Sequence, residues 1–227
     1  MSDLGTDHEA VRRVRRRLLS WGRANFRDYP WRTETDGWLT LVAEVMLQRT
    51  RASQVAPVFE EFRSRYPTAT DLVRAGPEAA AAITERLGIH WRGPLLYALT
   101  VAVEEHGGTP PDRLDQLRAI TGVGPYTAAA WLSMHRWHRA VIVDANVSRW
   151  LSRMTGNPYQ RDPRHVRWIN ELADRLTPRR AYRDYNYAVL DFTMTVCTPR
   201  KPACPICPLR RDCSYGQQRF DVLADRV

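Results

Sequence analysis

The most informative pattern of the chain lies in the segment Leu117–Arg149, LRAITGVGPYTAAAWLSMHRWHRAVIVDANVSR. Its first residues predict a short helix, Thr121–Pro125 predicts a tight turn, and a second helix is expected to open near Tyr126. Glycines at 122 and 124 allow a turn with positive φ and bring backbone N–H groups to the surface. Because these groups lie at a helix N-terminus, which favours anions, the turn is expected to bind a phosphate group.

A carboxylate follows this unit. Asp144 stands after the apolar run Val141–Val143 and before residues that predict another helix. An N-cap of that helix is one interpretation of this position, since Asp is among the preferred N-cap residues. A chemical role is the other interpretation.

The rest of the chain shows apolar residues at helical spacing, without strand-like alternation or an internal repeat. The chain is therefore expected to be all-α. The expected helices are Glu9–Asn25, Trp38–Thr50, Ala52–Tyr66, Thr70–Ala75, Pro77–Leu87, Leu95–His106, Val147–Met154, Pro163–Leu176 and Tyr185–Thr195.

Composition and charge narrow the function classes. The 227 residues carry 34 Lys and Arg against 25 Asp and Glu, a formal net charge of +9. This charge favours polyanions, although it fits a merely basic soluble protein equally well. No apolar run approaches the roughly 20 residues that span a bilayer, and the N-terminus has no apolar signal core. We therefore expect no membrane association and a cytoplasmic location, nucleoid-associated if the protein is bacterial.

Glu44 interrupts the most apolar of the expected helices, WLTLVAEVMLQRT. A carboxylate among aliphatic residues is costly to bury unless it is paired, lies in a cleft or takes part in chemistry. Helical periodicity equally permits a surface position, so both interpretations stay open on the residues alone.

The cysteines all lie near the C-terminus, with six, two and five residues between successive members. Such a loop has too little apolar content to fold alone, and disulfides are uncommon in the cytosol, so the spacing predicts a metal site. Zinc is the common occupant of four-thiolate sites. The four residues are Cys197, Cys204, Cys207 and Cys213.

Taken together, these motifs resemble the helix-hairpin-helix superfamily of DNA glycosylases over almost the whole chain. The cysteine spacing is similar to that of the endonuclease III and adenine mismatch glycosylase families, so the resemblance implies a [4Fe–4S] cluster rather than zinc. It also implies two helical lobes, with DNA across the cleft between them. The helix-barrel lobe would span residues 30–142, and the second would join residues 1–29 to 143–227, with the cluster loop at 197–213.

The resemblance also assigns roles to residues. It implies a monomer acting on double-stranded DNA that contains a mispair, with Asp144 stabilising positive charge on the sugar. Glu44 would act at the base or position water, and Tyr126 would contact the flipped base. The residues expected to contact DNA are Gly122, Val123, Gly124 and Thr127 at the hairpin, and Gln48 or Arg49 in the vacated stack.

Three subfamilies compete for the assignment. Bifunctional enzymes of the endonuclease III type carry a lysine where this chain has Tyr126, and tyrosine cannot form a Schiff base. Adenine mismatch glycosylases usually carry a further C-terminal domain, whereas 14 residues follow Cys213 here. Mismatch-specific thymine glycosylases share Tyr126 and the Val143–Asn146 motif. We therefore expect a monofunctional glycosylase removing thymine or uracil opposite guanine. Excision of adenine from A:G or A:8-oxoguanine pairs is the alternative, and a non-catalytic DNA-binding protein is a lesser one.

Overall fold

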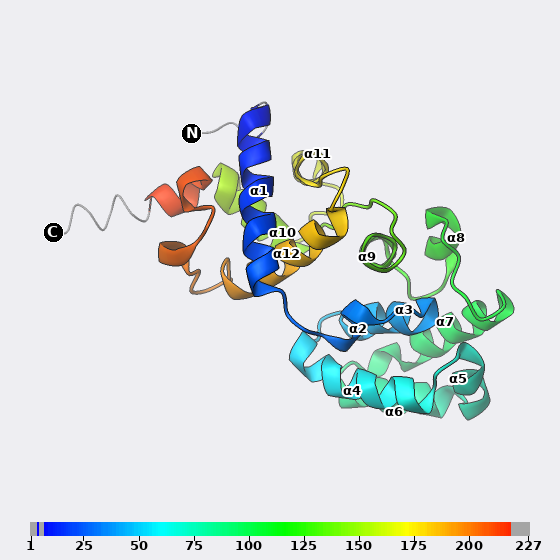
Figure 1. Ribbon diagram of the computed structural model, residues 1–227. Coiled ribbons are helices and arrows are strands. Elements are labelled where there is room, and N and C mark those ends of the chain that lie inside the picture. The colour runs from blue at the N-terminus through cyan, green and yellow to red at the C-terminus, as the bar shows by residue number, and fades with distance from the viewer. Residues whose placement is uncertain (1–3, 5–6, 219–227) are drawn as a thin grey trace. The chain divides into compact units, whose positions relative to one another are not determined.

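The computed structural model describes Leu4 and residues 7–218. The chain divides into two compact units, one formed by Met1–Arg27 with Arg139–Val227 and the other by Asp28–His138. The described residues form helices and no strand, which confirms the all-α prediction (Figure 1). None of the described helices has the length and apolar character needed to cross a bilayer.

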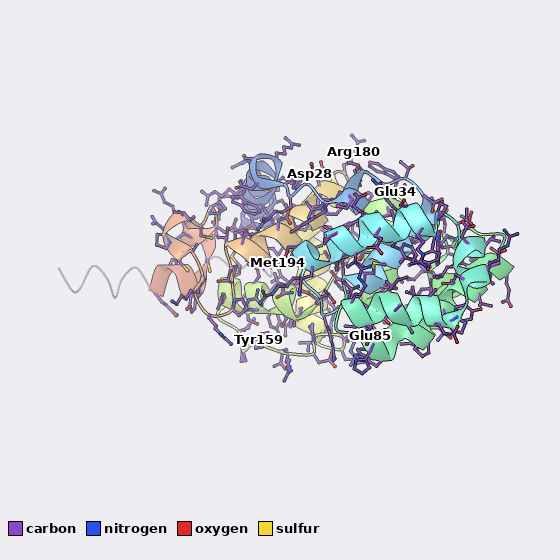
Figure 2. The ribbon with its side chains drawn as sticks, turned by 90° about the horizontal axis from the view of Figure 1, so that it is seen from below. Asp28, Glu34, Glu85, Tyr159, Arg180 and Met194 are labelled. Atoms are coloured by element: carbon purple, nitrogen blue, oxygen red, sulfur yellow. The ribbon has the colours of Figure 1, made fainter. Side chains whose placement is uncertain are left out.

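The Asp28–His138 unit is organised around α3, Gly37–Met46, every residue of which is buried. Asp36 caps its N-terminus by accepting a 2.9 Å hydrogen bond from the Leu39 amide. Just before it, Glu34, labelled in Figure 2, accepts hydrogen bonds from the amides of Thr35 and Asp36. The helices around α3 are α2 Pro30–Thr33, α4 Ala52–Arg65, α5 Ala69–Ala75, α6 Pro77–Arg86, α7 Gly93–Glu105, α8 Leu114–Ala119 and α9 Pro125–His135, with the 3-10 turn η1 His90–Arg92.

The end of α3 differs from the expected one. The apolar pattern predicted a helix up to Thr50, but α3 ends at Met46 and a turn follows. Arg49 has φ +64°, a left-handed conformation that is incompatible with a continuing right-handed helix. Propensity could not show this, because Gln and Arg are both good helix formers.

The second unit packs α1, His8–Asn25, against α12, Tyr182–Thr195. Gly22 permits this approach, since a Cβ at its position would lie 2.5 Å from the Cβ of Ala188. The core between them holds Val14, Leu18 and Phe192. The remaining elements are α10 Ala145–Thr155, α11 Arg167–Leu176 and the 3-10 turns η2 Cys204–Ile206 and η3 Arg210–Asp212.

Part of the arginine run on α1 has structural partners. Arg13 and Arg17 form ion pairs with the buried Asp212 at 2.7 and 2.5 Å. Arg15 donates to the backbone carbonyls of Arg175 and Leu176 at the end of α11. These contacts attach α1 to the cysteine-rich segment and to α11, so this face of α1 is more than a solvated basic surface.

Candidate functional site: hairpin, carboxylates and cysteine cavity

The hairpin of the Asp28–His138 unit joins α8 to α9 by the turn Ile120–Gly124. Gly122 has φ +91°, the conformation that favours glycine. Gly124 instead has φ −79° and ψ 171°, so the expectation of a positive φ holds for one of the two glycines. Gly124 is the N-cap of α9, where Pro125 at the first position needs no N–H partner.

The backbone amides of the hairpin differ in whether they donate a hydrogen bond within the protein. The amide of Val123 donates to the carbonyl of Ile120 at 3.1 Å, within the turn. Among the described residues, no backbone carbonyl accepts from Gly122 or Gly124. A Cβ built on Gly124 would meet nothing within 4 Å. This side of the turn is therefore open to a ligand with acceptor oxygens, at a helix N-terminus that favours an anion.

Glu44 lies within α3 and is 4% exposed. Its Oε1 is 3.0 Å from Nε2 of His135, the last residue of α9, whose side chain is 1% exposed. A buried, paired carboxylate is the arrangement in which such a group is tolerated in an apolar helix. His135 was not singled out from the sequence, because a single histidine at the end of an apolar helix carries no pattern.

Asp144 is the N-cap of α10 in the second unit. Its Oδ1 accepts hydrogen bonds from the amides of Asn146 and Val147 at 2.9 and 2.7 Å. Its Oδ2 accepts from the Asn146 side chain at 2.8 Å. The capping interpretation of this residue is therefore correct, and the same three bonds fix the orientation of its carboxylate.

A chain of contacts leads from Asp144 toward the cysteines. The Asn146 side chain that donates to Asp144 also accepts a 2.9 Å hydrogen bond from Arg149. Arg149 donates in turn to the carbonyl of Cys197, with Nη2 at 3.0 Å. Burial lowers the pKa of the Arg149 guanidinium. Asp144 and the start of the cysteine segment are thus held by one hydrogen-bonded network.

The residues after α3 meet the start of α9. Gln48 donates a 2.7 Å hydrogen bond from Nε2 to the hydroxyl of Thr127, which is 3% exposed. Tyr126 lies one residue earlier and is half-buried. The exposed Arg49 lies beside Trp91 of η1, with Cζ 5.9 Å from the ring centroid, and the sequence patterns gave no reason to single out this tryptophan. Trp91 is 47% exposed, which places an aromatic face at the protein surface.

The four cysteines line one small cavity of about 20 Å³. Apolar side chains of α10 and α12, including Trp150 and Phe192, form its wall. Burial raises the pKa of the Cys207 thiol to about 12 and that of Cys213 to about 11. Ligation of a metal would therefore have to compensate the cost of forming thiolates in a buried place.

Comparison with known proteins identifies the family of this chain. The family model described as "HhH-GPD superfamily base excision DNA repair protein" matches residues 42–174. The chain is 31% identical over 203 residues to the thymine/uracil-DNA glycosylase of Methanothermobacter thermautotrophicus, covering 88% of this chain and 92% of that protein. It is 34% identical over 194 residues to the adenine DNA glycosylase of Mycolicibacterium smegmatis, covering 85% of this chain but 66% of that protein.

A solved structure shows the same fold. The structure of a thermostable thymine-DNA glycosylase superposes with a TM-score of 0.85 at 29% sequence identity, over 92% of this chain and 98% of that one. The fold and the hairpin define a helical DNA-repair protein. The chain belongs to the HhH-GPD superfamily of base-excision DNA repair proteins.

Proposed function

We propose that the protein is a monofunctional DNA glycosylase that hydrolyses the N-glycosidic bond of thymine or uracil mispaired with guanine in duplex DNA. The choice of thymine or uracil as the released base rests on the similarity to a thymine/uracil-DNA glycosylase, which covers 88% of this chain and 92% of that protein. An adenine DNA glycosylase is matched over a smaller part of its length, which makes adenine excision the weaker candidate.

The hairpin supplies DNA binding in this proposal. The amides of Gly122 and Gly124 donate to no backbone carbonyl of the described residues, and the space beside Gly124 at the start of α9 is open, so a phosphate oxygen is proposed to accept their hydrogen bonds. Gln48 and Arg49 are the two candidates for the side chain that fills the gap in the DNA base stack after the base is flipped out. Gln48 is held by Thr127, whereas Arg49 is exposed beside Trp91.

Asp144 supplies the sugar chemistry. Hydrolysis of the glycosidic bond develops positive charge at C1′, and a fixed carboxylate stabilises that charge without further reorganisation. The three hydrogen bonds from Asn146 and Val147 supply this rigidity. Tyr126, at the start of α9, is proposed to contact the flipped pyrimidine.

The small number of amines in the chain supports the proposed absence of a lyase step. A Schiff base with the abasic sugar requires a primary amine, and Lys201 is the only lysine in the sequence. Tyr126 occupies the hairpin position where bifunctional relatives of the endonuclease III type carry lysine. The product is therefore proposed to be an uncut strand with an abasic site.

We propose that Cys197, Cys204, Cys207 and Cys213 hold a [4Fe–4S] cluster. When bound, the cluster would connect these four residues of the C-terminal segment to one another. All four line one cavity. The spacing of six, two and five residues between them is similar to that of the endonuclease III and adenine mismatch glycosylase families, which favours the cluster over zinc. Iron and sulfide analysis with visible absorbance tests this, since a colourless protein with one bound zinc would contradict it.

The experiment that tests the activity uses duplexes with G:T, G:U, A:G and A:8-oxoguanine pairs, and a matched duplex as control. After incubation, abasic sites are cleaved with alkali and the products are separated. The proposal expects cutting at the G:T and G:U duplexes, and only after alkali. Cutting confined to the adenine substrates would favour the alternative, and no cutting with retained DNA binding would favour a non-catalytic protein.

A further inference from the structure

The pair formed by Glu44 and His135 carries an inference about how the glutamate works, which rests on the proposed glycosylase function. Oε1 of Glu44 lies 3.0 Å from Nε2 of His135, and both side chains are almost fully buried. The two residues come from different helices, α3 and α9, which pack against each other. Their contact is therefore a defined part of this unit rather than a chance meeting of surface groups.

The ring nitrogen of His135 that does not face Glu44 indicates where the proton of the pair lies. Nδ1 of His135 is buried and has no hydrogen-bond partner among the described residues. If Glu44 donated to Nε2, or if the imidazole were fully protonated, Nδ1 would carry an N–H group in a place without an acceptor. Orphaned buried N–H groups are rarer than orphaned acceptors. The arrangement with the proton on Nε2, a bare Nδ1 and an ionised Glu44 avoids that cost.

The second carboxylate oxygen is available. Oε2 of Glu44 accepts no hydrogen bond from the described residues, and it is not among their fully buried polar atoms without a partner. His135 therefore occupies one oxygen of Glu44 and leaves the other for a substrate or a water molecule.

The surrounding charges are paired elsewhere. Beside His135, Arg136 binds Asp112, with Asp36 and His138 as further neighbours of that pair. Charged groups on the other elements packed against α3 and α9 also have partners. Arg63 on α4 forms ion pairs with Glu34 and Glu60, and Arg113 forms one with Asp115 of α8. Glu104 on α7 accepts a hydrogen bond from Thr70, and Arg32 of α2 lies over the Tyr29 ring. None of these contacts involves Glu44, so His135 is its ion-pair partner among the described residues.

We propose that His135 is a positioning residue that keeps Glu44 ionised, so that Glu44 acts in base excision as a proton acceptor rather than as an acid. In the step, the C1′–N bond breaks and its electron pair leaves with the base, while a water oxygen bonds to C1′. The water proton passes to Oε2 of Glu44 and is later released to solvent, and the departing base anion takes a proton from solvent.

The test compares His135→Phe, which removes the donor, with His135→Gln, whose Nε2 keeps a donor near the same place but does not titrate. His106→Gln, an exposed histidine at the end of α7, is the matched control. Single-turnover base release from a G:T duplex is measured across pH. We expect His135→Phe to lose about 10- to 100-fold at neutral pH, the worth of a hydrogen bond to a charged group. Its acid limb should move to higher pH, because the buried carboxylate then takes up a proton more readily. His135→Gln should lose less and keep its acid limb closer to that of the parent.

A double mutant that also carries Glu44→Gln separates the positioning role of His135 from a role in packing. In Glu44→Gln, adding His135→Phe should change the rate by less than about twofold, since a residue that acts through Glu44 has nothing left to act on. Equal losses in His135→Phe and His135→Gln, with unchanged pH profiles and additivity with Glu44→Gln, would overturn the proposal.

A readout without activity distinguishes failure of the inference from failure of the proposed function. In protein with ¹⁵N-labelled histidine, the His135 ring is identified by its loss from the His135→Gln spectrum. A proton on Nε2 at neutral pH supports the inference, and a proton on Nδ1 overturns it, whether or not any duplex is a substrate. Release of no base by the parent would instead sink the proposed function alone.

Discussion

The side-chain amide of Gln48 donates a 2.7 Å hydrogen bond to the hydroxyl of Thr127, which joins the turn after α3 to the first turn of α9. Both residues lie in the Asp28–His138 unit. Because Thr127 lies in the first turn of α9, just after the hairpin, this bond links the turn that carries Arg49 to the hairpin. Changes at either turn are therefore expected to affect DNA binding.

Arg49 offers a matched pair of substitutions, since its φ of +64° strains any residue except glycine. Arg49→Gly and Arg49→Ala both remove the side chain, but only Gly relieves the backbone. We predict that Arg49→Gly unfolds with a free energy about 1 kcal/mol higher than Arg49→Ala in urea titrations. If the side chain alone matters for the duplex, both variants should lose the same base-release activity. Lower stability of Arg49→Gly would contradict the left-handed turn.

Gly124→Ser separates DNA binding from folding. A Cβ at Gly124 meets nothing within 4 Å in the protein, and Ser is a better N-cap than Gly. We predict an unchanged or slightly raised melting temperature together with a loss of about tenfold in duplex affinity, as expected when one charge-assisted contact to phosphate is blocked. Thr121→Ser, on the same turn, is the control for both measurements. Unaltered affinity would show that no phosphate approaches the Gly124 amide.

Asp144 has both a capping and a proposed chemical role, and two substitutions divide them. Asparagine is as good an N-cap as aspartate, whereas alanine is not. Asp144→Asn is therefore expected to be more stable than Asp144→Ala by about 1 kcal/mol. Both should lose about 10²- to 10³-fold in single-turnover base release, because neither carries the charge. Base release by Asp144→Asn at the parental rate would show that Asp144 acts only as the N-cap of α10.

Tyr126→Lys tests the proposed absence of strand cleavage. The variant places a primary amine at the start of α9, so borohydride is expected to trap it covalently on DNA containing an abasic site. The parent protein should not be trapped. If it is trapped, the signal should be compared in Lys201→Arg, because Lys201 is the only lysine in the chain. Loss of trapping in that variant would assign a lyase activity to Lys201.

The sequence was sufficient for features that depend on local patterning. Periodicity identified an all-α chain, and the expected helix of Glu9–Asn25 is found as His8–Asn25. The hairpin motif located α8 and α9, because glycine and proline mark turns by backbone geometry alone. Family resemblance, which the comparisons confirm, came from motifs whose residues are close in sequence.

Features that depend on contacts between distant residues were not available from the sequence. Glu44 and His135 are separated by 91 positions, and no local pattern relates them. The left-handed conformation of Arg49 shortened α3 against the propensity of its residues. Likewise, the exposure of Trp91 and the ion pairs of Asp212 with Arg13 and Arg17 are results of tertiary packing.

Identification of the free base shows which mispaired base the protein releases. A mixture of G:T, G:U, A:G and A:8-oxoguanine duplexes, in equal amounts, is incubated with the protein, and the released bases are identified by mass spectrometry. We predict thymine and uracil as the released bases, with their release reduced about 10²- to 10³-fold in Asp144→Asn. Adenine as the main product would contradict it.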